Sequence, residues 1–225
     1  YSTNDREEIQ FNFFRGEDGG QVAAMDEGEV ESYHRNLMNS LKAQEYLKGR
    51  CVSRDVMEIY NLGFDPQEDV VLFPVYTRRG EVLFYKSRSL KGKRFFNAKE
   101  VDKTAAVYGL YQTLEAEIPA DTEIWLVESE IDALSLVSRG YLAWAFMGSD
   151  ISDKQIKEMC QSPYRRFVIA TDNDEAGRKA ARRIKDKLIP LGFRFFNLQW
   201  LTDMKDINEL IQNYGDDFTD YLNRY

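Results

Sequence analysis

Cysteine, histidine and long hydrophobic runs are scarce in this 225-residue chain. Cys51 and Cys160 are the only cysteines, which argues against a disulfide framework and leaves too few ligands for a zinc ribbon. His34 is the only histidine, so a histidine-based catalytic triad would have to depend on one residue in a polar helical stretch. We therefore expect two idle thiols, no zinc in this chain and no triad chemistry.

No apolar stretch approaches the roughly 18 to 20 residues that cross a bilayer, and no basic, apolar leader opens the chain. We therefore expect a cytoplasmic protein without a membrane partner. A phosphate-binding GxxxxGKS/T loop is also missing, which excludes a P-loop ATPase in this sequence. The first residue is Tyr1 and not Met, so we expect the natural N-terminus to lie upstream.

Charge is distributed unevenly along the chain. The net charge is −8, but affinity for phosphate depends on local patches and not on the sum. Residues 77–103 hold nine Lys or Arg against three acids, whereas residues 1–32 hold nine acids and two bases. We interpret the acidic segment as a linker or lead-in with little structure. The basic stretch is a candidate surface for nucleic acid, with a solvated charged face as the alternative.

The pattern before residue 107 predicts a small α+β unit. Apolar residues recur at helical spacing over residues 31–48, and Gly49 is a suitable stop. Ser53 is the expected N-cap of a short second helix. The runs VVLFPVY and VLFYKSRS lie on either side of a turn at residues 77–80, which predicts an antiparallel hairpin that carries the basic stretch.

After residue 103 apolar strand-like runs alternate with helical ones. The strand-like runs are EIWLV, YLAWAF, RFVIATD and FRFFNLQW, and the helical segments between them include IDALSLVSRG and EAGRKAARRIKDKL. This alternation is the signature of βαβ units around a parallel sheet. The predicted fold class is therefore α/β.

Carboxylates stand at two strand ends of the predicted sheet. Glu128 comes directly after EIWLV, and Asp172 comes directly after RFVIAT, so both should project from the carboxyl edge, where open α/β sheets bind ligands. Asp174 and Asp132 lie close behind them in the sequence. Oxygen ligands without His or Cys select a hard cation such as Mg²⁺, which indicates phosphoryl or nucleotidyl transfer. The alternative is that these acids merely cap the helices that follow.

The segments VESEIDAL and ATDNDEAGRKAA resemble the two signature blocks of the Toprim family: a glutamate at one strand end, and Asp-x-Asp followed by Glu-Ala-Gly at another. The resemblance implies that Glu128 is the general acid or base and that it shares a metal site with Asp172 and Asp174. Gly177 matches the glycine of the second block. The family usually has glycine after the catalytic glutamate, where this chain has Ser129, so we expect a slightly altered turn.

A third segment, KDINEL, is similar to an acidic element of primase-type Toprim domains, which places Asp206 and Glu209 near the metal. A Lys-Asp pair before a helix is also an ordinary N-cap. Upstream, residues 46–110 resemble the N-terminal subdomain of DnaG-type DNA primases, from YLKGRCVSRDVMEIYNLGFD through KRFFNAKE to KTAAVYGLY. The resemblance implies contacts with template and nucleotides for Lys86, Arg88, Lys93, Arg94, Asn97 and Lys103.

Together these matches imply the catalytic core of a DnaG-type primase, a DNA-directed RNA polymerase that makes short RNA primers from NTPs on single-stranded DNA with Mg²⁺ or Mn²⁺. The blocks EIDAL, DEAGRKA and KDINE are especially similar to phage-type primases. The implied partners are single-stranded DNA, NTPs and a replicative helicase, in a bacterium or a phage-infected cell. The expected organisation is an acidic lead-in (1–32), a basic α+β subdomain (33–106) and a Toprim domain with helices on both faces of a parallel sheet (107–225).

The same residues allow three other functions. A Toprim-type nuclease would share the metal site but would cleave phosphodiesters without NTPs. A topoisomerase would need many more residues for the domain that carries a strand-cleaving tyrosine. A non-catalytic nucleic-acid-binding module is the third alternative, and the full set of Glu128, Asp172 and Asp174 argues against it.

Overall fold

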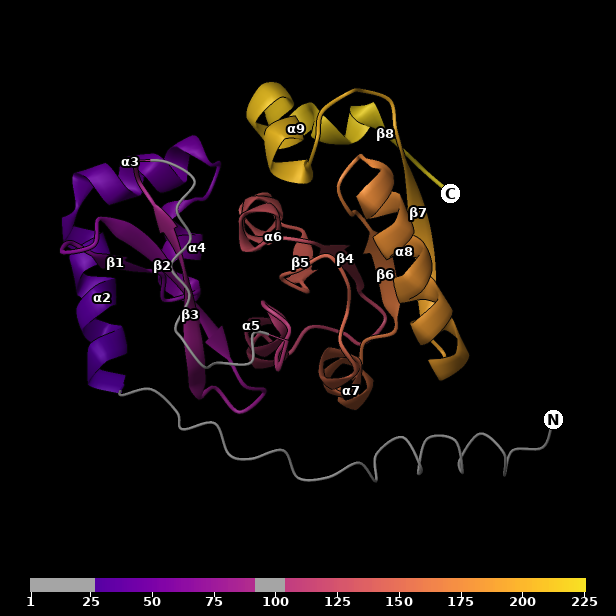
Figure 1. Ribbon diagram of the computed structural model, residues 1–225, viewed down its shortest axis with the longest axis horizontal. Helices are drawn as coiled ribbons and strands as arrows, with labels where there is room; N and C mark the ends of the chain where they lie inside the picture. Colours follow the sequence, from indigo (N-terminus) through magenta and orange to yellow (C-terminus); the bar gives the residue numbers. More distant parts are fainter. Residues whose placement is uncertain (1–26, 92–103) are drawn as a thin grey trace.

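The computed structural model describes residues 27–91 and 104–225 (Figure 1). The first part folds around a three-stranded antiparallel sheet of order β1-β2-β3. Its elements are α2 (Glu27–Asn39), α3 (Leu41–Gly49), α4 (Arg54–Ile59), β1 (Gly63–Asp65), β2 (Val70–Tyr76) and β3 (Val82–Ser89).

The second part folds around a five-stranded sheet of order β5-β4-β6-β7-β8, in which only β8 runs antiparallel to its neighbour. Its elements are α5 (Leu110–Glu115), β4 (Glu123–Val127), α6 (Glu130–Val137), β5 (Leu142–Ala145), α7 (Asp153–Gln161), β6 (Arg166–Ile169), α8 (Glu175–Leu188), η1 (Ile189–Leu191), β7 (Arg194–Trp200), α9 (Ile207–Tyr214), η2 (Gly215–Tyr221) and β8 (Leu222–Arg224). The predicted α/β class, with a small antiparallel unit before a mostly parallel sheet, is confirmed.

The helix predicted over residues 31–48 is in fact two helices, because the chain breaks at Ser40. Ser40 has an extended backbone (φ −103°, ψ 101°), and its hydroxyl accepts a hydrogen bond from the backbone N–H of Ala43. The buried Gln44 side chain donates to the carbonyl oxygens of Leu37 and Met38 at the end of α2. Side chains at the break thus supply hydrogen-bond partners for backbone groups at the end of α2 and at the start of α3. The apolar spacing gave no sign of it, because both helices pack on the same core.

Other elements of the first part follow the prediction. Ser53 caps α4 by accepting from the backbone N–H of Val56. The hairpin β2–β3 is present, and its register pairs Phe73 with Lys86. Helix α2 begins at Glu27, inside the segment 1–32 that was expected to have little structure. Residues 1–26 lie outside the described part of the chain, and the domain boundaries at 32 and 106 remain predictions.

The strand order of the second sheet creates a crevice between β4 and β6. The chain leaves β4 for β5 on one side and then returns to β6 on the other side. Such a reversal of direction leaves an open crevice at the carboxyl ends of the two strands, where ligands of α/β sheets bind. Helices cover both faces: α6 and α9 pack with Trp125 and Val127, while α7 and α8 pack with Ile124 and Leu126.

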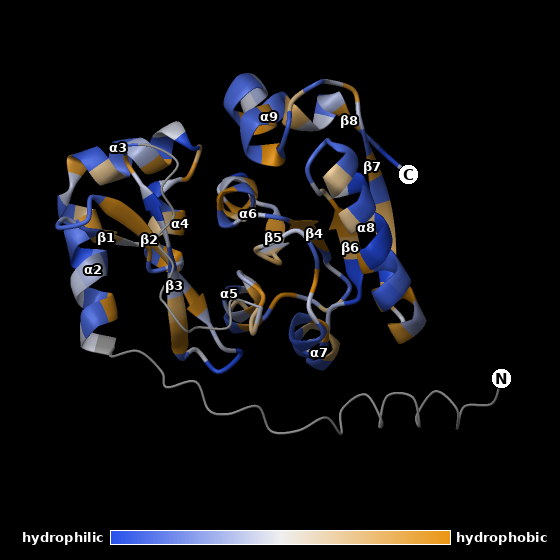
Figure 2. Ribbon diagram, viewed as in Figure 1, coloured by the Kyte–Doolittle hydropathy of each residue, from blue (hydrophilic) through white to orange (hydrophobic). Residues whose placement is uncertain are grey.

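The two parts share one hydrophobic core. A single buried cluster includes Leu47 of α3, Leu134 of α6 and Leu210 of α9. The rings of Tyr60 and Tyr108 lie 5.6 Å apart across the junction. Figure 2 shows the apolar residues concentrated on the strands and on the helix surfaces that meet them. The basic hairpin is therefore held in place against the parallel-sheet part by buried apolar contacts. No helix in the described ranges is both long and apolar enough to span a membrane.

Candidate active site

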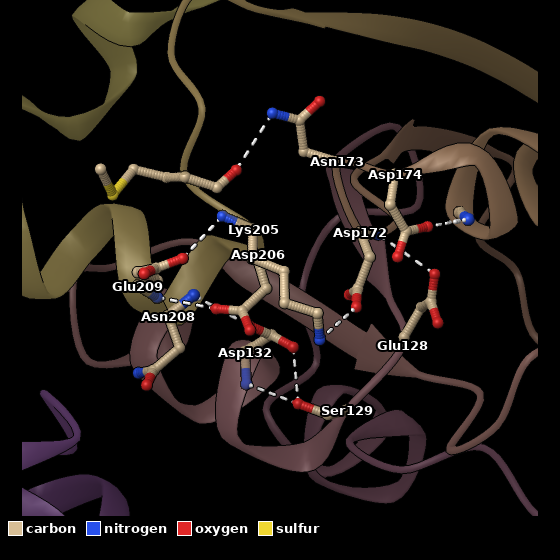
Figure 3. Close-up of polar contacts among 12 residues, drawn as sticks. Glu128, Ser129, Asp132, Asp172, Asn173, Asp174, Lys205, Asp206, Asn208 and Glu209 are labelled. Atoms are coloured by element: carbon tan, nitrogen blue, oxygen red, sulfur yellow. Dashed lines mark hydrogen bonds and ion pairs between the residues drawn. The ribbon is translucent and has the colours of Figure 1, made fainter.

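The carboxyl ends of β4 and β6 bring two acids together (Figure 3). Glu128 follows β4 directly, and Asp172 lies in the loop after β6. The backbone N–H of Asp172 donates to Oε1 of Glu128 at 3.1 Å. This hydrogen bond joins the two strand ends and holds the Glu128 carboxylate beside the Asp172 loop.

Asp174 occupies the N-cap of α8. Its Oδ1 accepts from the backbone N–H of Gly177 at 2.8 Å, and the positive end of the helix dipole favours its charge. A Cβ atom on Gly177 would lie 2.0 Å from the carbonyl oxygen of Asp172. The start of α8 therefore packs directly on the Asp172 backbone, at a distance that only glycine allows.

The KDINEL segment supplies a cation as well as an acid. Lys205 Nζ lies 3.0 Å from Oδ2 of Asp172, a contact that sequence reasoning missed. Asp206 caps α9 by accepting from the backbone N–H of Glu209, as an ordinary N-cap does, and it also lines the same cleft as Glu128 and Asp172. Glu209 accepts from the backbone N–H of Lys205 and does not line that cleft.

Asn173, between the two aspartates, ties the Asp172 loop to the KDINEL segment. Its backbone N–H donates to the carbonyl oxygen of Lys205 at 2.7 Å. Its side-chain amide donates to the carbonyl oxygens of Thr202 and Met204 at 2.9 and 3.0 Å. Asn173 was also missed from the sequence, where it is the variable residue of Asp-x-Asp. It sets the distance between the segments that carry Asp172 and Asp206.

Asp132 is buried, and both of its carboxylate oxygens are occupied. Oδ2 accepts from the Ser129 hydroxyl at 2.5 Å, and Oδ1 accepts from the backbone N–H of Asn208 at 2.8 Å. Asp132 thus positions the start of α9, which carries Asp206. Ser129, where the Toprim family usually has glycine, has an extended backbone (φ −118°, ψ 157°) and caps α6, so this turn needs no glycine.

Crowding and burial raise the pKa values of these acids. Burial, then the neighbouring charge of Asp172, raises the pKa of Glu128 to about 7. Burial, then the charge of Asp206, raises the pKa of Asp132 to about 7. Burial also raises the pKa of Asp172, although Lys205 opposes that shift. The ion pair with Asp172 raises the pKa of Lys205. Burial is thus the first cause of each raised carboxyl pKa, and the neighbouring carboxylates add to it.

Both parts of the chain line a cleft of about 300 Å³, into which Glu128, Asp132, Asp172 and Asp206 open. Asp174 is not among the residues that line it. Strand β3 contributes Lys86 and Arg88, and the sheet edge contributes Glu128, Asp172 and Asp206. Lys86 forms an ion pair with Glu130 at the start of α6, which fixes its position. The other residues expected to contact nucleotides or template lie outside the described ranges: Lys93, Arg94, Asn97 and Lys103.

The donors at this edge suit a hard divalent cation. Within residues 27–91 and 104–225, no three His, Cys, Asp or Glu side chains are gathered closely enough to ligate one ion together. Mg²⁺ needs fewer, because it typically takes one or two carboxylates and completes its shell with water and substrate phosphates. The raised pKa values of Glu128 and Asp172 mark the place where such a charge would relieve repulsion.

Comparison with known proteins agrees with this geometry. Residues 125–211 match the family described as Toprim-like. The chain is 26% identical to the uncharacterized protein MG010 of Mycoplasma genitalium, over 79% of this chain and 85% of that protein. It is 24% identical to the DNA primase of Haemophilus influenzae, over 86% of this chain but only 40% of the primase. The chain thus spans well under half the length of that primase.

Solved structures of primase cores share the fold. The catalytic domain of a DnaG primase bound to single-stranded DNA superposes with a TM-score of 0.71 at 20% identity, covering 97% of this chain and 78% of that one. The primase of Aquifex aeolicus gives 0.71 at 21% identity, over 88% and 60%. The primase fragment of bacteriophage T7 gives 0.59 at 19%, over 77% and 71%. The chain has the fold of a DnaG-type catalytic core, and these scores do not favour the expected phage-type resemblance over the bacterial one.

Gly177→Ala tests the close contact between α8 and Asp172. Because the new Cβ would lie 2.0 Å from the carbonyl oxygen of Asp172, the helix or the loop must shift. We expect a loss of about 1–3 kcal/mol in the free energy of unfolding, measured by urea denaturation. The control Gly49→Ala has no neighbour within 4 Å and should be neutral or stabilising by up to about 1 kcal/mol. Equal losses in both variants would contradict the packing.

Asp132→Asn tests the buried charge. Folding raises the pKa of Asp132 from 3.8 to about 7, so its contribution to stability is greatest at low pH and falls as pH rises through that interval. Asparagine cannot ionise, and we expect the variant to melt higher than wild type at pH 8. The gain should be several °C, on the order of 1–2 kcal/mol, and should shrink toward pH 5. Calorimetry of metal-free protein measures it. The control is Asp203→Asn at an exposed position. A gain in melting temperature that does not change with pH would contradict the raised pKa of Asp132.

Proposed function

We propose that this chain is the catalytic core of a DNA primase, which joins NTPs into short RNA primers on single-stranded DNA with Mg²⁺ or Mn²⁺. The observation that carries the proposal is the shared cleft. Acids from the edge of the parallel sheet line it together with Lys86 and Arg88 of the hairpin. A template-directed polymerase needs cationic groups for phosphates beside carboxylates for the metal. A nuclease would need the metal site but no nucleotide-binding hairpin across from it.

The proposed roles follow from the surroundings of each acid. Glu128, Asp172, Asp174 and Asp206 would share the metal ions between them, with one or two carboxylates on each ion and water or phosphate completing its shell. A bound cation there would lower the cost of charge on the attacking and leaving oxygens. Burial and the charge of Asp172 raise the pKa of Glu128 to about 7 in the metal-free protein, and we propose Glu128 as the group that takes a proton from the attacking hydroxyl. Both carboxylate oxygens of Asp132 already accept hydrogen bonds from Ser129 and Asn208, so its proposed role is to position α9 and not to bind metal or take a proton.

Cationic side chains would hold the triphosphate and the template. Arg88 lines the cleft, and Lys86 is oriented by Glu130 on α6. Lys205 lines the same cleft and pairs with Asp172, with its side chain 64% exposed. The template and nucleotide contacts proposed from the resemblance extend to residues outside the described ranges: Lys93, Arg94, Asn97 and Lys103.

The related primases support the proposed partners. A DnaG catalytic domain of the same fold is solved bound to single-stranded DNA, and relatives over most of this chain are DNA primases. We therefore propose single-stranded DNA and NTPs as ligands, a replicative helicase as a partner and the cytoplasm as the compartment.

Glu128→Gln and Asp172→Asn test the catalytic assignment. Each removes a charge from the crevice, so we expect each to lower dinucleotide formation on single-stranded DNA by at least about 100-fold. Formation is measured with labelled NTPs and with Mg²⁺ or Mn²⁺. Asp203→Asn is the control, because this exposed acid lies in the segment before α9 but does not line the cleft. Synthesis at the wild-type rate in both catalytic variants would end the proposal.

The same reactions separate a primase from a nuclease. Wild-type protein is incubated with labelled DNA and Mg²⁺, with each NTP omitted in turn. We expect RNA products that depend on NTPs and no shortening of the DNA. If the DNA were cleaved without any NTP and no RNA were made, the function would instead be that of a metal-dependent nuclease that uses the same acids.

A further inference from the structure

A second cleft, of about 400 Å³, lies between α8 and β7. Arg178, Arg182 and Lys185 line it from α8, at spacings that place them on one face of the helix. Asn197 and Gln199 line it from β7. None of these residues belongs to the cleft between the sheet edge and the hairpin. Figure 2 shows α8 as a strongly hydrophilic helix.

The arginines of this cleft are exposed and are not neutralised by acids. In the described part of the chain, the side chains of Arg178 and Arg182 have neither a hydrogen bond nor an ion pair. On the same helix, Lys179 pairs with Glu175, and Arg183 lies beside Asp150. Lys187 lies 4.0 Å from Asp153, so α8 keeps three of its cations beside acids and presents Arg178 and Arg182 to the cleft without partners. Unbalanced guanidinium groups in a groove favour an anionic ligand, above all phosphate.

The side chains of β7 alternate between the two faces of the sheet. Leu198 and Trp200 pack on the core that α6 and α9 cover, so Asn197 and Gln199 are the side chains that β7 turns toward α8 and the cleft. A polar wall beside arginines without acidic partners suits a phosphate backbone. Lys185 donates to Oδ1 of Asn197, which joins the two walls of the cleft.

The cleft is continuous with the candidate active site. Asp172 lines both clefts, and its neighbour Asn173 lines the second. Asp172 is the only Asp or Glu on the wall of the second cleft among the described residues, and Lys205 pairs with it. A strand that follows the arginines along α8 therefore arrives at the metal crevice.

We propose that the cleft between α8 and β7 binds the sugar-phosphate backbone of a single strand of nucleic acid that enters or leaves the crevice at Asp172. The proposal rests on the proposed function for the identity of the strand, template DNA or RNA product. Binding itself needs neither metal nor NTPs.

Fluorescence anisotropy of end-labelled oligo(dT), and separately of end-labelled oligo(U), titrated with the full chain without metal or NTPs, tests this cleft. We expect saturable binding of at least one of the two probes by the wild-type protein. The double variant Arg178→Gln with Arg182→Gln should weaken binding by about 10-fold near 0.1 M salt. Its plot of log affinity against log salt should flatten by about 1.4, since each lost phosphate contact on a single strand removes about 0.7.

The matched control is Lys179→Gln with Arg183→Gln, which removes two charges at the same spacing from the balanced side of α8. We expect a change within about 2-fold, with circular dichroism unchanged for both double variants. A loss confined to oligo(dT) assigns the cleft to the template, and a loss confined to oligo(U) assigns it to the product. The proposal that this cleft binds nucleic acid would be wrong if the Arg178 and Arg182 variant had unchanged affinity for both probes, or if the two double variants lost affinity equally.

These outcomes are independent of primer synthesis. If the wild-type protein makes no RNA but the Arg178 and Arg182 variant binds more weakly as expected, the polymerase assignment is wrong and the proposal for the cleft is supported. If the wild-type protein makes primers and this variant binds normally, the proposal for the cleft is wrong and the polymerase assignment is supported.

Discussion

Repulsion among carboxylates at one edge of a sheet is the constraint on which this structure depends. Such charges are costly in a partly buried crevice unless donors or cations compensate them. Backbone N–H groups provide much of that compensation, because four acids each accept one from the adjacent loop or helix: Glu128, Asp132, Asp174 and Asp206. The loops are therefore shaped by the charges they carry, and the remaining negative charge is the property a metal ion would use.

The acids at the sheet edge could be predicted from the sequence because each lies within a few residues of the strand that positions it. Glu128 and Asp172 each follow a short apolar strand, and parallel strands end at a common edge. The contacts that shape the crevice are not local. Asn173 bonds to carbonyl oxygens 29 and 31 positions away, and Asp132 bonds to an N–H 76 positions away. A pattern of periodicity and residue type does not determine such pairs, and Lys205 was missed as a partner of Asp172 for the same reason.

The first part shows a second limit. Residues 31–48 have helical spacing throughout, yet the break at Ser40 is decided by polar groups: a hydroxyl that caps the new helix and the Gln44 amide that satisfies the old one. The junction between the parts has similar requirements. Gly109 adopts φ +87°, and a Cβ there would lie 2.6 Å from the carbonyl oxygen of Ala143. The position of the hairpin, and with it Lys86 and Arg88, therefore depends on close backbone packing that composition does not reveal.

The partner of Asp172 explains how the crevice can remain available to a cation. An ion pair whose lysine is largely exposed contributes only about 0–1 kcal/mol, and the side chain of Lys205 is 64% exposed. Lys205 therefore balances the charge of Asp172 without closing the site, because a divalent ion with substrate phosphates can displace it at small cost. Asp132 has no such exchangeable partner, because it is buried and both of its oxygens accept hydrogen bonds from within the protein. Asp132 thus has both oxygens committed to hydrogen bonds within the protein, whereas Asp172 keeps an exposed partner that a ligand can replace.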